Sequence, residues 1–284
     1  FPPSDDINKY AVYERYDADR NFKTQYWPYG NQGLGMQNPY WIINRNMFNT
    51  DRDRYIISLS MKWNITNWLN IIGRARIDNA YTDFERKLYA STDGLFAKSQ
   101  GNYMNQEDKN TSTYLDFLVN VDKKFGENYH LLVNLGGSFY DEKYKSDTFE
   151  GNLVGVPNFF HPSNIPSTES NYNKSELHTQ TQSIYGKAEI GYRNFLYADV
   201  TGRIDWFSTL VGTSKEYVCY PSAGLSVILS EILPLPEKII SFWKIRGSYA
   251  QVGNPPSAYL PYATVALENG NATSANFTPA SHLK

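Results

Sequence analysis

The sequence of 284 residues is poor in cysteine, in long apolar runs and in excess charge of either sign. Its one cysteine, Cys219, excludes an intrachain disulfide framework and a metal site built from several cysteines. The 27 basic and 29 acidic residues leave a net charge of −2, so we expect no nucleic-acid partner, which would normally require a basic excess. No window reaches the roughly 18 consecutive apolar residues of a membrane-spanning helix.

Aromatic residues are abundant instead. They make up 15% of the chain, with 23 Tyr, 15 Phe and 6 Trp, beside 19 Gly and 14 Pro. This composition suits strands and turns and argues against a helical bundle. The chain begins at Phe1 without an initiator Met or a signal segment, so we expect a mature form or a piece of a longer protein.

Strict two-residue alternation of apolar and polar residues is the strongest pattern. It predicts eight antiparallel strands in four consecutive hairpins. The alternating runs cover residues 55–65, 69–77, 115–121, 131–139, 184–192, 196–206, 219–229 and 243–249. Most are longer than the roughly 5–6 residues of an average soluble strand and approach the roughly 9–11 residues that cross a bilayer at a tilt.

The predicted connections differ at the two ends of the strands. Tight turns near 66–67, 126–128 and 193–194 and a proline-containing turn at 231–240 gather at one end. Long polar loops near 82–112, 146–180 and 207–216 gather at the other. Short periplasmic turns opposite long extracellular loops are typical of an outer-membrane β-barrel.

Aromatic residues flank each predicted short turn, in the pairs Trp63 and Trp68, Phe125 and Tyr129, Tyr192 and Phe195, and Phe242 and Trp243. Rings at the headgroup level form the girdles of such barrels. A general preference of aromatics for strands would explain them too, but the repetition at four turns favours girdles.

The apolar face must contact either lipid or a protein core. If it contacts lipid, the opposite, charged face lines a lumen; in a soluble sandwich that face would merely be solvated. The lumen-facing charged residues of the lipid interpretation are Arg74, Arg76, Asp78, Lys187, Glu189, Arg203, Asp205, Lys244 and Arg246.

Eight strands can close into a small barrel, yet the flanking segments favour a piece of a larger one. Residues 1–50 are expected to form an extracellular loop and the lead-in to the first strand, with 40–44 extended and no strand paired within the segment. Residues 51–254 hold the eight strands, and 255–284 begin a further extracellular loop.

Three ordered motifs resemble the barrel strands of SusC/RagA-type TonB-dependent outer-membrane transporters of Bacteroidetes-like Gram-negative bacteria. They lie at residues 203–210 (RIDWFSTL), 220–226 (YPSAGLS) and 244–254 (KIRGSYAQVGN), and residues 38–41 (NPYW) with 49–54 (NTDRDR) resemble the approach to an earlier strand. The resemblance extends over nearly the whole chain. Phe207 and Cys219 depart from the pattern, where a small polar residue and an aromatic are more usual.

This resemblance implies an all-β fold: a segment of a transmembrane barrel of about 22 strands, of which the chain would hold roughly the middle third. It also implies a plug and a TonB-contacting segment, both expected to be absent from this chain, and a SusD-like surface lipoprotein as partner beside the lipid of the outer membrane.

We find no pattern of catalysis, cofactor binding or metal ligation, and we expect no enzyme. The four histidines have no metal-binding spacing. Asp17, Asp19 and Asn21 imitate a calcium loop, but Phe22 and Pro28 occupy the positions that need Gly and Glu.

Aromatic side chains in the predicted loops are candidates for substrate contact, because rings stack on sugars or grip peptides while Asn and Asp supply hydrogen bonds. They are Tyr26, Trp27, Tyr29, Tyr40, Trp41, Phe159, Phe160 and Tyr172. Packing among the loops, or against a lid protein, is an equally weighted alternative.

The leading hypothesis is therefore TonB-dependent import of an oligosaccharide or peptide-like nutrient. A passive or structural barrel, such as a porin or adhesin, is the alternative.

Overall fold

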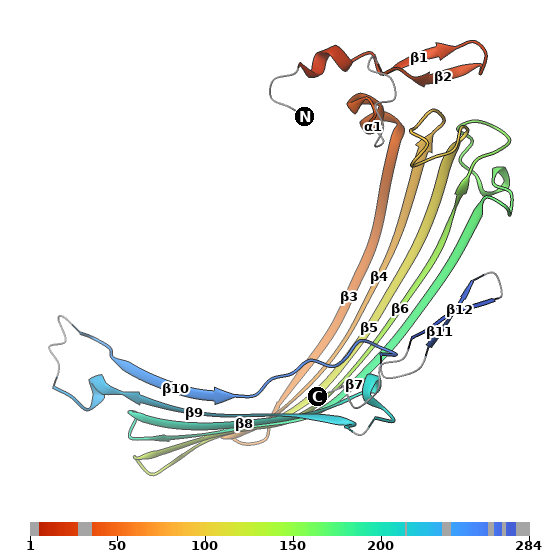
Figure 1. Cartoon of the computed structure of the whole chain (residues 1–284). Helices are drawn as coiled ribbons and strands as arrows, with labels where there is room; N and C mark the ends of the chain where they lie inside the picture. The colour runs from red at the N-terminus through yellow and green to blue at the C-terminus, as the bar shows by residue number, and fades with distance from the viewer. Residues whose placement is uncertain are drawn as a thin grey trace. The chain divides into compact units, whose positions relative to one another are not determined.

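An eight-stranded antiparallel sheet dominates the computed structural model of the chain (Figure 1). Its strands follow one another in the order β10-β9-β8-β7-β6-β5-β4-β3, so every neighbour in the sheet is also a neighbour in sequence. The structure describes residues 6–27, 36–213, 215–234 and 240–260, and the backbone of 264–268 and 271–276.

The sheet consists of β3 (Asn46–Asn64), β4 (Leu69–Tyr89), β5 (Gly101–Phe125), β6 (Tyr129–Asn152), β7 (Ser170–Tyr192), β8 (Leu196–Phe207), β9 (Tyr217–Ile228) and β10 (Lys244–Ala250). Two separate hairpins pair β1 (Glu14–Asp17) with β2 (Phe22–Gln25) and β11 (Thr264–Glu268) with β12 (Asn271–Asn276). The helical elements are α1 (Pro39–Arg45) and the 3-10 turns η1 (Ile7–Tyr10), η2 (Pro162–Asn164), η3 (Ser208–Leu210) and η4 (Leu229–Glu231). Among the described residues, no helix has the length and apolarity needed to cross a membrane.

The prediction of eight strands in four hairpins is confirmed, but two of the predicted long loops are too long. Strands β4 to β7 extend through much of 82–112 and 146–180, which leaves residues 90–100 and 153–169 between them. Alternation of apolar residues is needed only where one face meets an apolar medium. Further along the strands both faces are polar, so the ladder continues without a hydrophobic pattern.

Residues 1–50 also hold more structure than predicted. The extended segment expected at 40–44 is instead part of α1, β1 and β2 pair with each other, and β3 begins at Asn46. The signal for α1 was present in the sequence, because Asn38 is a favourable N-cap residue and Pro39 suits the first helical position.

Pro221 lies inside β9 rather than at its start, opposite Gly202 of β8. Its carbonyl accepts a hydrogen bond from the Gln251 amide, just beyond Ala250, the last residue of β10. In an antiparallel strand the amide and the carbonyl of one residue point to the same neighbouring strand. The nitrogen of Pro221 therefore faces β10 just beyond Ala250, where the pairing of β9 with β10 ends, so the ladder needs no donor there.

The chain divides into two compact units, each described here by itself. Unit 1 comprises residues 1–55, 79–110 and 144–176, and unit 2 comprises residues 56–78, 111–143 and 177–284. Unit 2 holds the alternating runs. In it, β8 pairs without a shift with β7 on one side, from Thr181–Phe207 to Tyr192–Leu196, and with β9 on the other, from Leu196–Val227 to Trp206–Tyr217.

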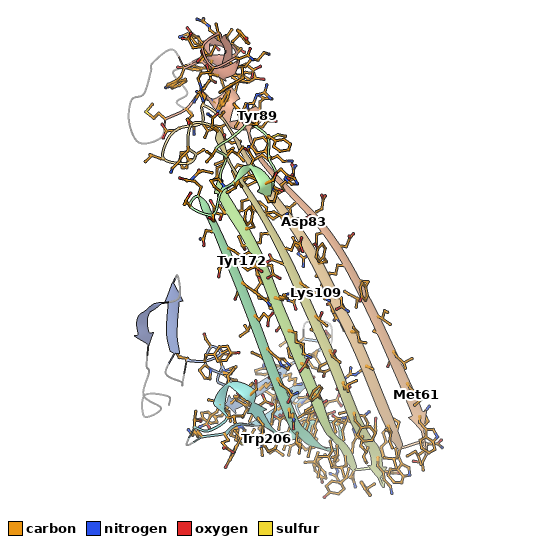
Figure 2. All side chains as sticks on the ribbon, turned by 90° about the vertical axis from the view of Figure 1, so that its right-hand side faces the viewer. Met61, Asp83, Tyr89, Lys109, Tyr172 and Trp206 are labelled. Atoms are coloured by element: carbon orange, nitrogen blue, oxygen red, sulfur yellow. The ribbon has the colours of Figure 1, made fainter. Side chains whose placement is uncertain are left out.

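The alternation gives unit 2 an apolar face and a charged face. The apolar face carries side chains such as Leu59, Ile184 and Val200, which are 70%, 62% and 56% exposed. Figure 2 marks Met61 of β3 and Trp206 of β8 on this face. Contiguous rows of exposed large apolar side chains are typical of a surface that meets lipid or a partner rather than water.

Unit 1 is held together by buried polar contacts around Asn38, which has no exposed surface. Its side-chain oxygen caps α1 by accepting from the Tyr40 amide at 2.9 Å. Its side-chain nitrogen donates to the carbonyls of Tyr10 at 2.9 Å and Tyr26 at 3.0 Å. One side chain thus joins α1 to the segments before β1 and after β2.

A carboxylate links the β1–β2 hairpin to α1. Glu14 Oε2 accepts from Arg45 Nε at 2.9 Å and Nη2 at 2.7 Å, and Glu14 Oε1 accepts from Lys23 Nζ at 2.8 Å. Burial by itself raises the pKa of Glu14, but the hydrogen bonds from Lys23 and Arg45 outweigh burial, and the net pKa is lowered. The carboxyl is therefore charged at neutral pH.

We predict that this link weakens in acid. Because the pKa of Glu14 is lower in the folded state, its contribution is complete above the unfolded value of about 4.3 and is lost as pH falls through the folded value. Hydrogen-exchange protection of the α1 amides, corrected for intrinsic rates, should fall between pH 6 and pH 3. Glu14→Gln should show reduced protection at pH 6 and little further change. Equal protection of the native protein at both pH values would contradict this account.

Candidate functional site

The charged face of unit 2 consists largely of internally paired charges. Three pairs join residues two apart on one strand: Arg76–Asp78 at 2.7 Å, Lys187–Glu189 at 2.8 Å and Arg203–Asp205 at 2.6 Å. Residues two apart lie on the same side of a strand. Six of the nine predicted charged residues therefore share a face with their partner and are neutralised there.

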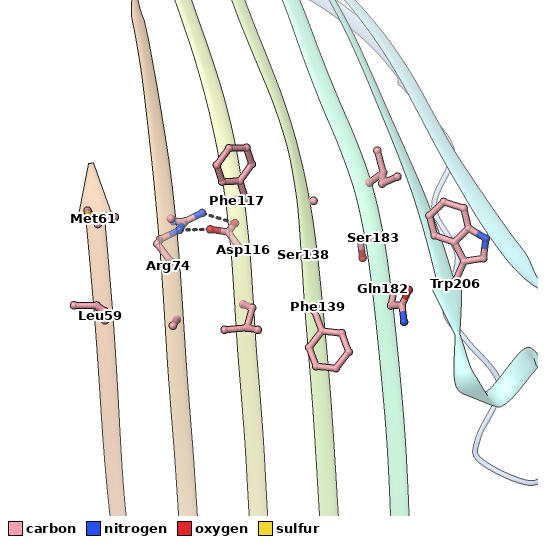
Figure 3. A pocket seen from close by; sticks show the side chains of 15 residues that line it. Leu59, Met61, Arg74, Asp116, Phe117, Ser138, Phe139, Gln182, Ser183 and Trp206 are labelled. Atoms are coloured by element: carbon pink, nitrogen blue, oxygen red, sulfur yellow. Dashed lines mark hydrogen bonds and ion pairs between the residues drawn. The ribbon is translucent and has the colours of Figure 1, made fainter. Parts of the chain in front are cut away.

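Asp116 organises the most extensive polar network of this face. Its side chain has no exposed surface and accepts from Arg74 Nε at 2.6 Å and Nη2 at 2.8 Å (Figure 3). The hydroxyls of Tyr185 and Tyr114 donate to the same carboxylate at 2.7 and 3.2 Å. Two-pronged arginine contacts are among the strong charge-assisted hydrogen bonds, and here they satisfy a buried carboxylate.

Gly136 permits this network by having no side chain. A Cβ at Gly136 would lie 2.7 Å from the Phe117 carbonyl oxygen and 2.8 Å from the Tyr185 ring. The ring thus crosses directly over the glycine on its way from β7 to Asp116 on β5. The hydrogen bond from Tyr185 to Asp116 therefore requires a residue without a side chain at position 136 of β6.

The Lys187–Glu189 pair and three further charged residues converge in a hollow of about 350 Å³ on the same face. Lys187, Glu189, Asp199, Lys244 and Arg246 line it together with the Tyr197 ring. Lys244 Nζ lies 6.0 Å from the centroid of that ring. The structure therefore brings Lys187, Glu189, Lys244 and Arg246, predicted from separate strands, to one place.

The aromatic candidates near α1 are mostly covered by neighbours. The Arg15 guanidinium lies 3.4 Å from the centroid of the Tyr26 ring, and the ring centroids of Trp27 and Tyr10 are 5.2 Å apart. Trp41 is 1% exposed, and its Nε1 donates to Thr92 Oγ1 at 3.1 Å. Burial assigns Trp41 to the packing of unit 1.

Tyr40 is half-buried in α1, and Tyr29 lies outside the described residues. Phe160 is also a packing residue, because its ring lies 4.9 Å from that of Tyr89 and borders a buried cluster of Tyr103, Leu153 and Ile165. Phe159 is 51% exposed and stacks on His161, with ring centroids 5.7 Å apart.

Tyr172 is 63% exposed on β7 (Figure 2). Its hydroxyl donates to Asp147 Oδ1 at 2.8 Å. On β7 the apolar row has even numbers, as in Ile184, and on β6 it has odd numbers, as in Phe139. Tyr172 and Asp147 therefore continue the apolar rows of their strands and not the charged rows.

Sequence reasoning missed a polar surface on the strand extensions of unit 1, at even-numbered positions that continue the charged rows of β4, β5 and β6. Asp108 accepts from Gln106 at 2.9 and 3.0 Å and from the Tyr144 hydroxyl at 3.1 Å. Arg86 contacts both Glu150 and Asn102. The even numbering of these positions is the signal that could locate them, but it has meaning only once residues 101–112 and 144–152 are known to be strands.

No group of three or more potential metal-ligating side chains occurs among the described residues.

Comparison with known proteins identifies the family. The model of the TonB dependent receptor-like β-barrel matches residues 2–283, and the chain belongs to this family. A comparison with curated proteins finds no match.

Solved structures show the same fold. Similar chains occur in the RagAB peptide importer in its "open-open" state, with a TM-score of 0.71 over 94% of this chain, and in its "closed-closed" state, with 0.67 over 93%. A further RagAB peptide transporter structure gives 0.68 over 89%. Sequence identity is 14% in each case, and the chain covers 30%, 29% and 28% of those chains, respectively.

These findings confirm the resemblance to SusC/RagA-type TonB-dependent transporters and the prediction of an antiparallel transmembrane β-barrel segment. In the described part of the chain the sheet is open, with β3 and β10 as its two edges.

We predict that Arg74→Ala destabilises the barrel more than Arg76→Ala. Losing Arg74 leaves the buried Asp116 carboxylate without its cation, which costs about 1.5–3 kcal/mol. Arg74 and Arg76 are about equally exposed, at 50% and 48%, but Arg76 contacts Asp78 through Nη2 alone, and the Asp78 side chain keeps 11% exposure, so this pair should contribute less than about 1 kcal/mol. Urea unfolding of the full-length protein in detergent checks both values, and equal losses for the two variants would refute a special role for Asp116.

Proposed function

We propose that this chain forms part of the wall of an outer-membrane transporter that imports a peptide or oligosaccharide in a Bacteroidetes-like Gram-negative bacterium. The observation that carries the proposal is the two-faced sheet, whose exposed apolar side chains suit lipid while its paired charges suit a water-filled lumen. Family membership supports transport rather than enzymatic activity.

Within this proposal, residues 51–254 supply barrel strands, and residues 1–50 and 255–284 belong to the extracellular side. Arg74, Arg76, Asp78, Lys187, Glu189, Arg203, Asp205, Lys244 and Arg246 face the lumen. Internal pairing supports this role, because free charges of one sign would hold an oppositely charged substrate too tightly to let it pass.

The substrate surface that we propose combines exposed rings with the polar surface of unit 1. Phe159 and the half-buried Tyr26, Trp27 and Tyr40 remain ring candidates, and Tyr172 is a weaker one. Arg86, Asp108, Tyr144 and Glu150 add donors, acceptors and both signs of charge. This mixture suits the amides and charged termini of a peptide at least as well as sugar hydroxyls, and the similar structures are of a peptide importer.

Two partners follow from the family: TonB, which would supply energy through segments outside this chain, and a SusD-like lipoprotein, which would close the extracellular side. Uptake that persists in a strain without TonB would instead support a passive barrel.

We predict that Asp108→Asn in the full-length transporter lowers uptake of a labelled peptide mixture or oligosaccharide about tenfold, the equivalent of one hydrogen bond to a charged group. Asp147→Asn is the matched control. Asp147 also accepts from a tyrosine hydroxyl, that of Tyr172, but it continues the apolar row of β6 and so lies outside the proposed substrate surface. Unchanged uptake in Asp108→Asn, at equal amounts in the outer membrane, would refute the proposed substrate surface.

A further inference from the structure

The apolar face of unit 2 contains a hollow of about 720 Å³ (Figure 3). Leu59 of β3, Phe117 of β5, Phe139 of β6 and Ile184 of β7 stand around it, and Trp206 of β8 closes one side. All five belong to the apolar rows of their strands. The hollow therefore opens to the side that the proposed function assigns to lipid.

Small residues in the apolar rows create the hollow. Gly73 and Ala75 of β4 and Gly137 of β6 lie among the larger side chains. A Cβ built on Gly73 would have no heavy atom within 4 Å, so the space above it is empty. The face thus has a local depression between protruding side chains.

One side of the hollow carries polar groups. A second hollow of about 420 Å³ shares Gln182, Ile184 and Trp206 with the first, and beyond them Phe207 and Val211 line it together with the polar side chains of Gln180, Ser208 and Glu216. Further along the same rows, His178 Nε2 lies 2.6 Å from Asp141 Oδ1, and Lys143 Nζ lies 3.9 Å from Asp141 Oδ2. An apolar hollow therefore adjoins a surface rich in amide, hydroxyl and charged groups.

The polar side lies toward the long connections. Phe139 ends the apolar run of β6, Ile184 begins that of β7, and Trp206 ends that of β8 just before the connection at 208–216. In the proposed orientation these are the extracellular ends of the apolar runs, beyond which β6 and β7 continue as polar extensions. The hollow is therefore placed in the outer leaflet, with its polar side at the headgroup level.

We propose that the two hollows bind one glycolipid of the outer leaflet, with an acyl chain over Gly73 and the sugar headgroup beside Gln180, Gln182 and Ser208. Apolar continuity with the lipid-facing surface favours an acyl chain. The amide and hydroxyl groups suit sugar hydroxyls, and the carboxylates of Glu216 and Asp141 beside Lys143 and His178 disfavour a headgroup that offers only a phosphate. The inference rests on the outer-membrane location in the proposed function.

Filling the depression tests the site. In the full-length transporter, Gly73→Leu places a side chain in the hollow. Gly202→Leu is the matched control, because Gly202 lies in the apolar row of β8, also has no heavy atom within 4 Å of a built Cβ, and lies outside both hollows. Native mass spectrometry after detergent extraction, and after re-addition of purified lipopolysaccharide, measures the bound lipid.

The native protein and Gly202→Leu should each retain one lipopolysaccharide, and Gly73→Leu should retain at least fivefold less. Equal retention by the two variants, no stoichiometric lipid, or a bound phospholipid would overturn the inference. Membrane fractionation distinguishes failure of the proposed function from failure of the glycolipid site. A protein absent from the outer membrane refutes the proposed function, whereas a correctly located protein without bound lipopolysaccharide refutes only the glycolipid site.

Discussion

A strand that crosses a bilayer must pair every backbone amide and carbonyl, because hydrocarbon offers no water to satisfy them. In unit 2 this need is met strand by strand, as the unshifted pairing of β8 with both β7 and β9 illustrates. Unbroken pairing fixes the register, and a fixed register sends successive side chains to opposite sides. The apolar and charged faces are thus a consequence of backbone pairing.

The charged face then has to hold ionised groups beside a low-dielectric wall. Pairing along a strand, as in Lys187–Glu189, and across strands, as in Arg74–Asp116, leaves little net charge. Glycine makes room for the hydroxyl that completes this network, because the Tyr185 ring passes over Gly136 on its way to Asp116. On the apolar face, Gly73 leaves a depression instead. The same residue type therefore supports a polar contact on one face and an apolar hollow on the other.

The sequence was informative wherever one face of a strand meets an apolar medium. Alternation from Tyr55 to Ile65 and from Leu196 to Trp206 placed strands that the structure contains. It gives no signal from Asn105 to Ser112 of β5, where both sides are polar and the ladder has no hydrophobic signature. For Trp41 the sequence leaves substrate contact and loop packing equally open, because burial by distant residues such as Thr92 has no local pattern, and the structure supports packing. Asp108 and Tyr144 were missed because their segments were read as loops.

The central claim is that successive residues of one strand face lipid and water in turn. Single cysteines at positions 198 to 203 of β8 test it in the full-length protein in vesicles, after Cys219→Ser removes the native thiol. We predict that a water-soluble maleimide labels positions 199, 201 and 203, while a bilayer-embedded quencher reaches probes at 198, 200 and 202. Uniform labelling along these six positions, or the reverse parity, would contradict the account.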